Sequence, residues 1–427
     1  MTMPSGAASR PAIPLRATII LVATLGGVYI VSQFLRNSVG VIAPDLAREL
    51  TLSAAEIGLL SSTFFFSFAA AQIPLGICLD RYGPKFCMLA CAGIAAGGAV
   101  LFAAGTSPGM LIAARVLMGV GSCCYLMAPL ALYAKRYSPQ QFGTLVGIQL
   151  GVGTLGTLLA TAPLAWSVAF MGWRATFLAV AGLMVLAGIL VALIVREDNP
   201  AAHAVHHETF RESIAGLKQA LRSRSVGPLF FCHLAAYSSF VLVVGLWGGP
   251  YLTHIYGYGL TERGDMLFAA VVAQIIAAFL YGPTDRIFRG YKIPVFFGSF
   301  LTGLTLLSVA WLGVLPPGWL MVWFLAIGAL TAYTPVMIAH GKSLFPPNLA
   351  GRGLTILNMA TMGGAFLSQT VTGFVINQFP LENGAYALDA YRAVFGLQGL
   401  FVVAGCIPYL WAYDPWRDAH GHPARKG

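Results

Sequence analysis

The sequence predicts an all-α polytopic membrane protein with twelve transmembrane helices in two six-helix bundles. Of its 427 residues, 58% are hydrophobic and only 9% are charged, and the mean hydropathy is +0.77. Soluble globular domains carry about 25% charged residues, so this composition excludes them. The apolar residues are gathered into about twelve runs of roughly 20 residues, the length that crosses a bilayer.

The first six runs form a predicted N-terminal bundle over residues 1–195. The first run, residues 17–43, is longer than the apolar region of a signal peptide and continues past Arg36, so we expect it to remain as a span. The next five spans are expected near 56–77, 86–105, 110–132, 143–166 and 173–195.

A polar segment, residues 196–226, is predicted to be a cytoplasmic linker. Asp198, Asn199 and Pro200 stop a helix there, and basic residues follow at the spacing of a surface helix. The second bundle and a short tail then occupy residues 227–427. Its spans are expected near 227–250, 263–284, 293–314, 318–339, 352–377 and 390–413.

The distribution of basic residues predicts the orientation. Nineteen of the 25 Lys and Arg residues fall on the side that holds both termini. Cytoplasmic loops carry an excess of Lys and Arg, so we expect both termini in the cytoplasm and the protein in a bacterial cytoplasmic (inner) membrane. This bias also accounts for the net charge of +10 without nucleic acid. The opposite side holds four basic residues, and two lie within spans: Arg48, Arg174, Arg263 and Arg392, then Arg36 and Arg115.

The loop between the second and third spans carries a motif. Residues 76–85 read Gly-Ile-Cys-Leu-Asp-Arg-Tyr-Gly-Pro-Lys, between two runs without charge. The pattern Gly-x-x-x-Asp-Arg-x-Gly-x-Lys resembles the signature loop of the major facilitator superfamily of secondary transporters. That resemblance implies two similar halves that alternate access to a site between them. It also implies gating roles for Gly76, Asp80, Arg81, Gly83 and Lys85; alternatively, these charges only determine topology.

A second Asp-Arg pair, Asp285 and Arg286, follows the eighth span. The position corresponds to that of the first loop, and the resemblance implies a gating role here too. The flanking glycines, Gly282 and Gly290, depart from the spacing of the signature.

Two arginines lie inside predicted spans. An intramembrane arginine is costly unless it faces water or a partner, so it marks a functional site by default. Arg36 lies about eight residues before Pro44 and Arg115 about seven after Pro108, on antiparallel spans, so both are expected at similar depth. A guanidinium group suits carboxylate and phosphate. The alternatives are that Arg36 reaches the lipid headgroups and that Arg115 pairs with backbone carbonyls.

Residues 29–44 resemble the first helix of the anion:cation symporter and organophosphate exchanger branches of the superfamily, in which an Arg contacts the anionic substrate. The resemblance implies this role for Arg36. Aromatic and amide side chains of other spans are candidates to line the same site, although each can also be a packing residue. They are Tyr29, Tyr125, Gln149, Tyr237, Trp247, Tyr333, Asn358 and Gln369.

None of the 15 acidic residues falls in the middle of a predicted span. Carriers of protons with sugars, and of cationic drugs, usually use a buried carboxylate, so this pattern favours an anionic substrate. His233, near the start of the seventh span, is the candidate for proton coupling because it titrates near neutral pH. The alternatives are a structural histidine and a substrate that brings its own proton.

We expect no cofactor, no metal site and no catalytic residue. The seven cysteines lie in or beside spans without a Cys-x-x-Cys pair, and no His-Glu-x-x-His or serine elbow is present, so the chain is not expected to be an enzyme. The expected partners are a small anionic molecule, a coupling proton or counter-anion, and the bilayer around a monomer.

These features together predict a secondary active transporter, working by alternating access, that moves a small organic or phosphorylated anion. The alternative is an exporter of amphipathic or drug-like compounds in which both intramembrane arginines are structural.

Overall fold

The computed structural model describes residues 14–196, 221, 226–345 and 350–416. In these ranges, eleven helical segments are long and apolar enough to cross a membrane. One of them, α3 (Ala54–Ala103), would be about 75 Å long as a single helix, more than twice the hydrocarbon thickness of a bilayer. Its backbone breaks at Gly83, where φ is 81° and ψ is 163°, a conformation open to glycine. We therefore count two spans in α3 and twelve in the described residues.

The first bundle contains the first six spans. A capping box starts α3, because Ser53 Oγ accepts from the Glu56 amide while the Glu56 carboxylate accepts from the Ser53 amide. Gly172 breaks α7 with a φ of 78° and separates the fifth span from the sixth. The other elements are α1 (Leu15–Asn37), α2 (Val39–Leu50), α4 (Pro108–Ser122), α5 (Met127–Arg136), α6 (Pro139–Leu159) and α7 (Ala162–Ile194).

The second bundle contains the other six spans. Its first span is α9 (Val226–Leu242), a π-helical turn (Val243–Trp247) and α10 (Gly248–Tyr256). A short antiparallel hairpin, β1 (Leu381–Glu382) with β2 (Ala385–Tyr386), joins the last two spans. The remaining elements are α11 (Leu260–Tyr281), α12 (Thr284–Ile287), α13 (Lys292–Leu312), α14 (Pro317–Leu330), the 3-10 turn Thr331–Tyr333, α15 (Thr334–Ser343), α16 (Ala350–Ile376), α17 (Leu388–Cys406) and the 3-10 turn Pro408–Trp411.

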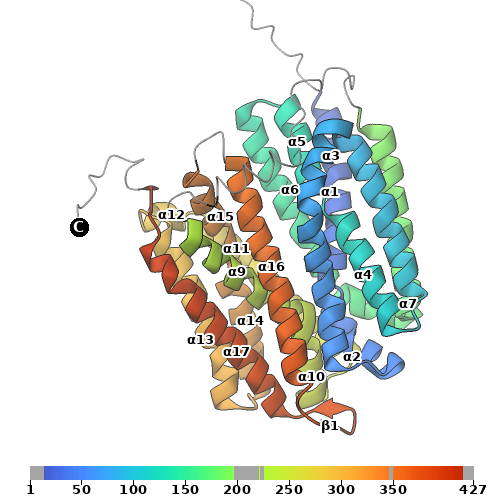
Figure 1. Cartoon of the computed structure of the whole chain (residues 1–427), viewed down its shortest axis with the longest axis vertical. Helices are drawn as coiled ribbons and strands as arrows, with labels where there is room; N and C mark the ends of the chain where they lie inside the picture. Colours follow the sequence, from blue (N-terminus) through green and yellow to red (C-terminus); the bar gives the residue numbers. More distant parts are fainter. Residues whose placement is uncertain (1–13, 197–220, 222–225, 346–349, 417–427) are drawn as a thin grey trace, which may run out of the picture.

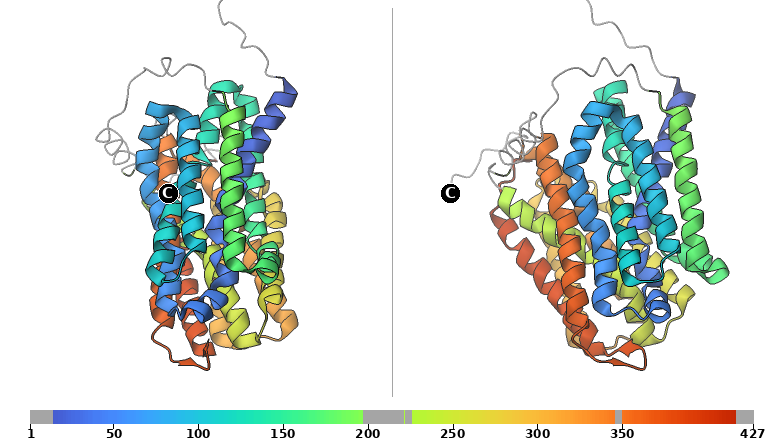
Figure 2. Two further views of the ribbon diagram at one scale, coloured as in Figure 1. Left: turned by 90° about the vertical axis from the view of Figure 1, so that its right-hand side faces the viewer. Right: turned by 45° about the vertical axis from the view of Figure 1, so that its right-hand side comes forward.

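Figure 1 shows the two bundles side by side, the first in blue to green and the second in yellow-green to red. The turned views of Figure 2 show the helices of both running in nearly the same direction. The predicted linker, 196–226, lies almost wholly outside the described residues, so the predicted domain boundaries stay a prediction.

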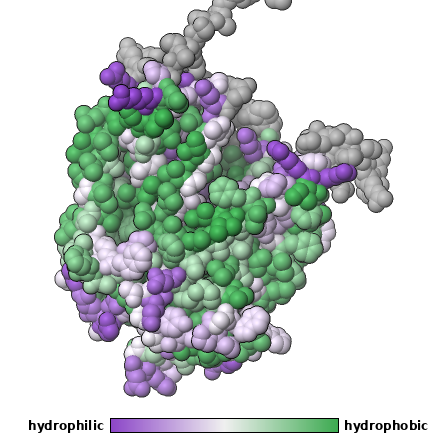
Figure 3. Space-filling view, turned by 180° about the vertical axis from the view of Figure 1, so that it is seen from behind, coloured by the Kyte–Doolittle hydropathy of each residue, from purple (hydrophilic) through white to green (hydrophobic). Residues whose placement is uncertain are grey.

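The surface agrees with a bilayer environment. Hydrophobic residues cover most of the middle of the face in Figure 3, and hydrophilic residues gather toward its upper and lower ends. Large apolar side chains are exposed on spans of both bundles: Leu193, Phe279 and Trp311 are 72%, 78% and 84% exposed. Such exposure would be costly in water and is favourable against lipid.

The two ends of the molecule differ. The start of α1, the turn at Gly83 and the end of α17 lie at one end, which we call the terminal end; α2, α10 and the β hairpin lie at the other (Figure 1). At the second end the bundles touch closely. A methyl group built on Gly58 would lie 2.8 Å from the Gly373 Cα, and one on Gly40 would overlap the Val244 carbonyl oxygen. We call this the closed end, because the backbones of the two bundles meet there.

Candidate functional site

Arg36 lies between the two bundles where the close contact begins. It is 7% exposed, its guanidinium stacks 4.7 Å from the ring of Phe68 on α3, and Nη1 donates to Tyr237 Oη on α9 at 3.5 Å. This last distance is at the long limit of a hydrogen bond. No carboxylate lies within 4.0 Å of Arg36 among the described residues. Its Nε, buried as well, has no hydrogen-bond partner in those residues.

Arg115 is close to Arg36 but differently held. It is fully buried, with Nε donating to the Leu60 carbonyl at 3.1 Å and Nη1 to the Leu35 carbonyl at 2.5 Å. The ring of Phe64 lies 4.7 Å from its guanidinium and stacks on that of Phe68, one turn along α3. The expected similar depth of the two arginines therefore agrees with the geometry. For Arg115 the geometry favours the alternative, pairing with backbone carbonyls.

Two tyrosines accompany Arg36. Tyr29 lies two turns earlier on the same face of α1, close to Arg36 and Tyr237. It packs on Gly153 of α6, where a larger residue would displace its ring. Arg36, Tyr29 and Tyr237 thus form one polar cluster between the bundles, and all three are candidates from the sequence.

Four other candidates are enclosed in one bundle by their own hydrogen bonds or packing. Tyr125 donates to the Met88 carbonyl at 3.4 Å. Gln149 is satisfied at both ends of its amide, by the Leu25 and Tyr125 carbonyls and by Tyr133 Oη. Trp247 Nε1 donates to Thr372 Oγ1 at 2.9 Å, and Tyr333 packs on Gly298 and Tyr281. These side chains hold helices together.

Asn358 and Gln369 lie on α16. Asn358 is half-buried. Gln369 is fully buried, and its Nε2 donates to the Val241 carbonyl at 3.2 Å, one turn beyond Tyr237 on α9. Gln369 therefore lies near the polar cluster, whereas nothing described links Asn358 to it.

The predicted gating loop forms the turn inside α3. Lys85 Nζ donates to the Ala192 carbonyl near the end of α7 at 2.7 Å, and Arg81 stacks on Tyr82 at 5.3 Å. A methyl group on Gly76 would meet no atom within 4 Å, so Gly76 is not required for close packing here. Asp80 interacts with a neighbouring group.

The second Asp-Arg pair forms a local turn. Asp285 Oδ1 accepts from the Arg286 amide at 2.8 Å, and the Asp285 carbonyl accepts from the Gly290 amide at 2.9 Å. The different glycine spacing thus accompanies a one-turn helix, α12, that the first copy does not have.

His233 is 3% exposed inside the second bundle. Its Nδ1 lies 3.1 Å from Thr361 Oγ1 on α16, and its Nε2 faces Gly341 on α15, 3.9 Å from where a methyl group on that residue would lie. His233 precedes Tyr237 by one turn of α9, on the side of the terminal end, and it joins three helices of one bundle.

The sequence did not single out one ionic contact between the bundles. Arg263, counted as a basic residue of a loop, is 3% exposed on α11 and forms an ion pair with Asp45 of α2. Its Nε also donates to the Val41 carbonyl at 2.7 Å, and Nη1 to Thr253 Oγ1 at 3.1 Å. An ion pair thus joins the two bundles at the closed end. The sequence around either residue alone does not predict this pair.

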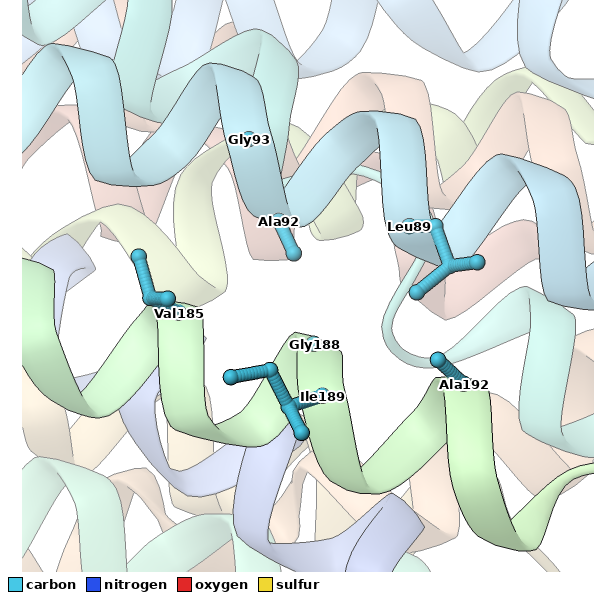
Figure 4. Close-up of a pocket in the computed structure, with 7 residues that line it drawn as sticks. All are labelled: Leu89, Ala92, Gly93, Val185, Gly188, Ile189 and Ala192. Atoms are coloured by element: carbon cyan, nitrogen blue, oxygen red, sulfur yellow. The ribbon is translucent and has the colours of Figure 1, made fainter.

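Figure 4 shows a pocket on the first bundle between α3 and α7, with a volume of about 270 Å³. Leu89 and Ala92 of α3 face Val185 and Ile189 of α7 across it. It offers apolar side chains only, so it has no group to bind an ion. Within the described ranges, no three His, Cys, Asp or Glu side chains are arranged to hold a metal ion.

Comparisons with known proteins agree with this architecture. The family model of the Major Facilitator Superfamily matches residues 25–261 and 229–427. The hexuronate transporter of Escherichia coli strain K12 is 21% identical over 440 residues, covering 96% of this chain and 98% of the relative. A probable sulfoacetate transporter of Cupriavidus necator is 26% identical over 278 residues, covering 61% and 63%.

A solved structure, that of a mutant of the nucleoside transporter NupG, superposes with a TM-score of 0.74 at 15% identity, covering 91% of this chain and 99% of the other. The relatives are transporters and not enzymes, as the sequence predicts for this chain. With a family match over nearly its whole length, twelve spans and two bundles, the chain belongs to the major facilitator superfamily of secondary transporters.

Proposed function

We propose that this secondary transporter moves a small organic anion, carboxylated or phosphorylated, and that Arg36 binds the anionic group. The observation that carries the proposal is the charge of Arg36, buried between the bundles without a carboxylate within 4.0 Å in the described residues. A buried guanidinium without a counter-charge is costly, and an anionic substrate would offset that cost.

Arg115 strengthens the proposal through its charge. Two of its three nitrogens are held by the Leu35 and Leu60 carbonyls, so we assign it a structural role rather than direct contact. Because it stacks on the ring next to that of Arg36, it adds a second positive charge to the same region. Electrostatic interactions weaken slowly with distance in a low-dielectric interior, so this charge also favours an anion.

The named substrates of the relatives support the anionic class. Hexuronate and sulfoacetate are both organic anions, one a carboxylate with hydroxyl groups and the other a sulfonated carboxylate. The two substrates differ in the groups that they carry besides the carboxylate.

We also propose that the terminal end faces the cytoplasm of a bacterial inner membrane. The excess of basic residues on that side supports this orientation. The closed end would then face outward, and the described state would be one that receives or releases substrate on the cytoplasmic side. The Gly76–Lys85 loop and the Asp285–Arg286 turn, both at the terminal end, would stabilise one of the two access states. We keep His233 as the candidate for proton coupling, with exchange against a counter-anion as the alternative.

Uptake into proteoliposomes tests the proposal. We expect radiolabelled hydroxylated and simple organic acids to be transported by the wild type, and Arg36→Ala to lose transport at least 100-fold while the protein still inserts. Arg36→Lys keeps the charge but not the planar fork, so we expect partial activity.

Arg48→Ala is the matched control, because the Arg48 side chain is 83% exposed. Undiminished transport by Arg36→Ala would refute the role of Arg36. Transport of lipophilic cations but no acid by the wild type would instead support an exporter of amphipathic compounds.

A further inference from the structure

Three helices of the second bundle contact the first bundle at the closed end. A methyl group on Gly249 of α10 would overlap the Gly40 carbonyl oxygen. One on Gly373 of α16 would lie 3.0 Å from the Gly58 Cα. Arg263 of α11 forms the ion pair already described. Close-packed contacts of this kind leave little room for displacement, so α10, α16 and α11 must keep fixed positions relative to one another while this end is closed.

His254 links these three helices. It lies on α10, and its Nδ1 is 3.4 Å from the amide nitrogen of Tyr386, in the hairpin that follows α16. The same nitrogen is 2.6 Å from Tyr391 Oη on α17. Its neighbour Thr253 accepts a hydrogen bond from Arg263 Nη1 at 3.1 Å. The position of α10 relative to the end of α16 and to Arg263 therefore depends on contacts at His254 and Thr253.

The hydrogen bonds of His254 require the neutral imidazole ring. A backbone N–H group only donates, so Nδ1 accepts from Tyr386 and carries no hydrogen. The Tyr391 hydroxyl then donates to Nδ1 as well. Tyr391 is fully buried, and within the described residues its hydroxyl has no other hydrogen-bond partner.

Water at the closed end can reach this ring. His254 is half-buried near the end of α10, whereas His233 is 3% exposed inside the same bundle. A proton can therefore reach His254 from the closed end without passing between the bundles. Histidine is also the side chain whose charge most readily changes near neutral pH.

A second proton on His254 would disrupt these contacts. With a hydrogen on Nδ1, the ring can no longer accept from the Tyr386 amide. The Tyr391 hydroxyl would have to turn its own hydrogen away, and no other acceptor lies within reach of it in the described part of the chain. Both losses leave a donor without a partner, which is unfavourable.

No counter-charge would stabilise the protonated ring at the closed end. Arg263, which is close to His254, is positive, and its carboxylate partner is Asp45. Among the described residues, no carboxylate lies within 4.0 Å of His254. When this end opens, water would surround both positive charges and weaken their repulsion. The other charged side chains on the elements around α10 are exposed or paired with each other: Arg48, Glu49, Glu262, Asp265, Glu382 and the pair Asp389–Arg392.

We propose that His254 is a proton-binding site of the transport cycle: the neutral ring holds the closed end shut, and a proton from the water at that end opens it. The proton binds better when this end is open, so binding shifts the population toward the open state. The inference uses the alternating access of the family and does not depend on an anionic substrate.

Two pairs of spin labels on the full chain, without its seven native cysteines, test the inference. Thr106→Cys and Gly318→Cys are exposed positions on the two bundles and report the separation at the closed end. Glu382→Cys with Gly318→Cys reports whether the hairpin moves within the second bundle. Between pH 8 and pH 4.5, the ratio of open to closed molecules should rise about tenfold, the combined effect of two lost hydrogen bonds.

Variants assign the response to this ring. His254→Asn keeps an acceptor but takes up no proton, so its ratio should change less than about twofold over this range. His254→Lys carries the charge already and should be open at pH 8. Tyr391→Phe removes the hydroxyl that opposes the proton, so it should open at a higher pH than the wild type, and it serves if His254→Lys does not fold. His207→Asn, in the predicted linker, is the control and should respond like the wild type.

A wild-type pH response in His254→Asn would overturn the inference and assign the response to another group, such as Asp45. A hairpin that moves at low pH while the distance between the bundles stays constant would overturn the link to the closed end. Distances that do not change with pH in the wild type would also overturn it, and the proposed anionic substrate would be unaffected by any of these results.

Discussion

The ion pair between Asp45 and Arg263 should control how firmly the closed end is shut. Asp45→Asn keeps the size of the side chain and removes its charge. Arg263 would then stay 3% exposed with only the Val41 carbonyl and the Thr253 hydroxyl as partners. Because the pair joins α2 of one bundle to α11 of the other, its loss affects the state with this end closed and not the state with it open.

The size of the effect follows from burial. Removing one partner of a buried ion pair costs about 3 to 5 kcal/mol. Asp45 is 22% exposed, and Arg263 retains two hydrogen bonds, so we take a smaller cost of about 2 to 3 kcal/mol. A free-energy change of about 1.4 kcal/mol changes an equilibrium constant tenfold. The ratio of molecules with this end open to molecules with it closed should therefore rise by about 30- to 150-fold.

Distances between spin labels measure this shift. Labels at Thr106→Cys and Glu382→Cys, exposed positions of the first and second bundle near the closed end, would report the separation in a background without the seven native cysteines. We expect a longer distance to become prominent in Asp45→Asn. Arg48→Gln is the control, because it breaks only the exposed contact of Arg48 with Asp45, which contributes little.

The double variant Asp45→Asn with Arg263→Leu provides a test of sign. It removes the buried charge together with its partner, so it should shift the equilibrium less than Asp45→Asn alone. A wild-type distance distribution in Asp45→Asn, or a larger shift in the double variant, would refute the reasoning.

Two further predictions concern the close backbone contact at Gly40 and the buried hydrogen bonds of Arg115. Gly40→Ala should also open the closed end, because its methyl group would overlap the Val244 carbonyl, and the same labels would report it; Gly27→Ala, with no atom within 4 Å of the new methyl, should not. If Gly40→Ala left the distances unchanged, the close backbone contact would not be what holds this end shut. Arg115→Lys should lower the midpoint of thermal unfolding, since loss of a charged buried hydrogen bond costs about 1.5 to 3 kcal/mol, yet leave the dissociation constant of a transported acid within about twofold. A large loss of affinity at unchanged thermal stability would instead assign Arg115 to the substrate.

The architecture was predictable from the sequence because one physical requirement governs it. A chain in lipid must satisfy its backbone hydrogen bonds within each segment, so apolar runs of about 20 residues become helices. The Gly83-Pro84 turn was visible as a polar interruption between two such runs. The long α3 agrees with this expectation, since its break lies inside the predicted loop.

The roles of the two arginines were harder to separate. Both Arg36 and Arg115 lie in apolar helices at similar depth, and an almost uniformly apolar helix gives little sign of which face points where. The difference arises from rotation: Arg115 points at the carbonyls of Leu35 and Leu60, and Arg36 points at the opposite bundle. Nothing in the local sequence specifies that rotation.

Arg263 illustrates a second limit. Next to Glu262 and close to Asp265, it has the sequence context of an exposed helix start, and its burial depends on α2 of the other half lying against it. The partner, Asp45, is 218 residues away. A contact between two charged residues so far apart in the sequence is determined by how the bundles pack. The local sequence around either residue does not determine it.

The π-helical turn at Val243–Trp247 has a consequence for how the two halves fit. A π turn holds about one residue more than an α turn, and each residue advances a helix by about 100°, so every side chain after it is rotated by about that amount. Gly249, which follows the turn, touches Gly40 of the other half in this rotation. The close contact between the halves therefore depends on the number of residues in one helix. Inserting or deleting a single residue there would misalign the contact even if every side chain were kept.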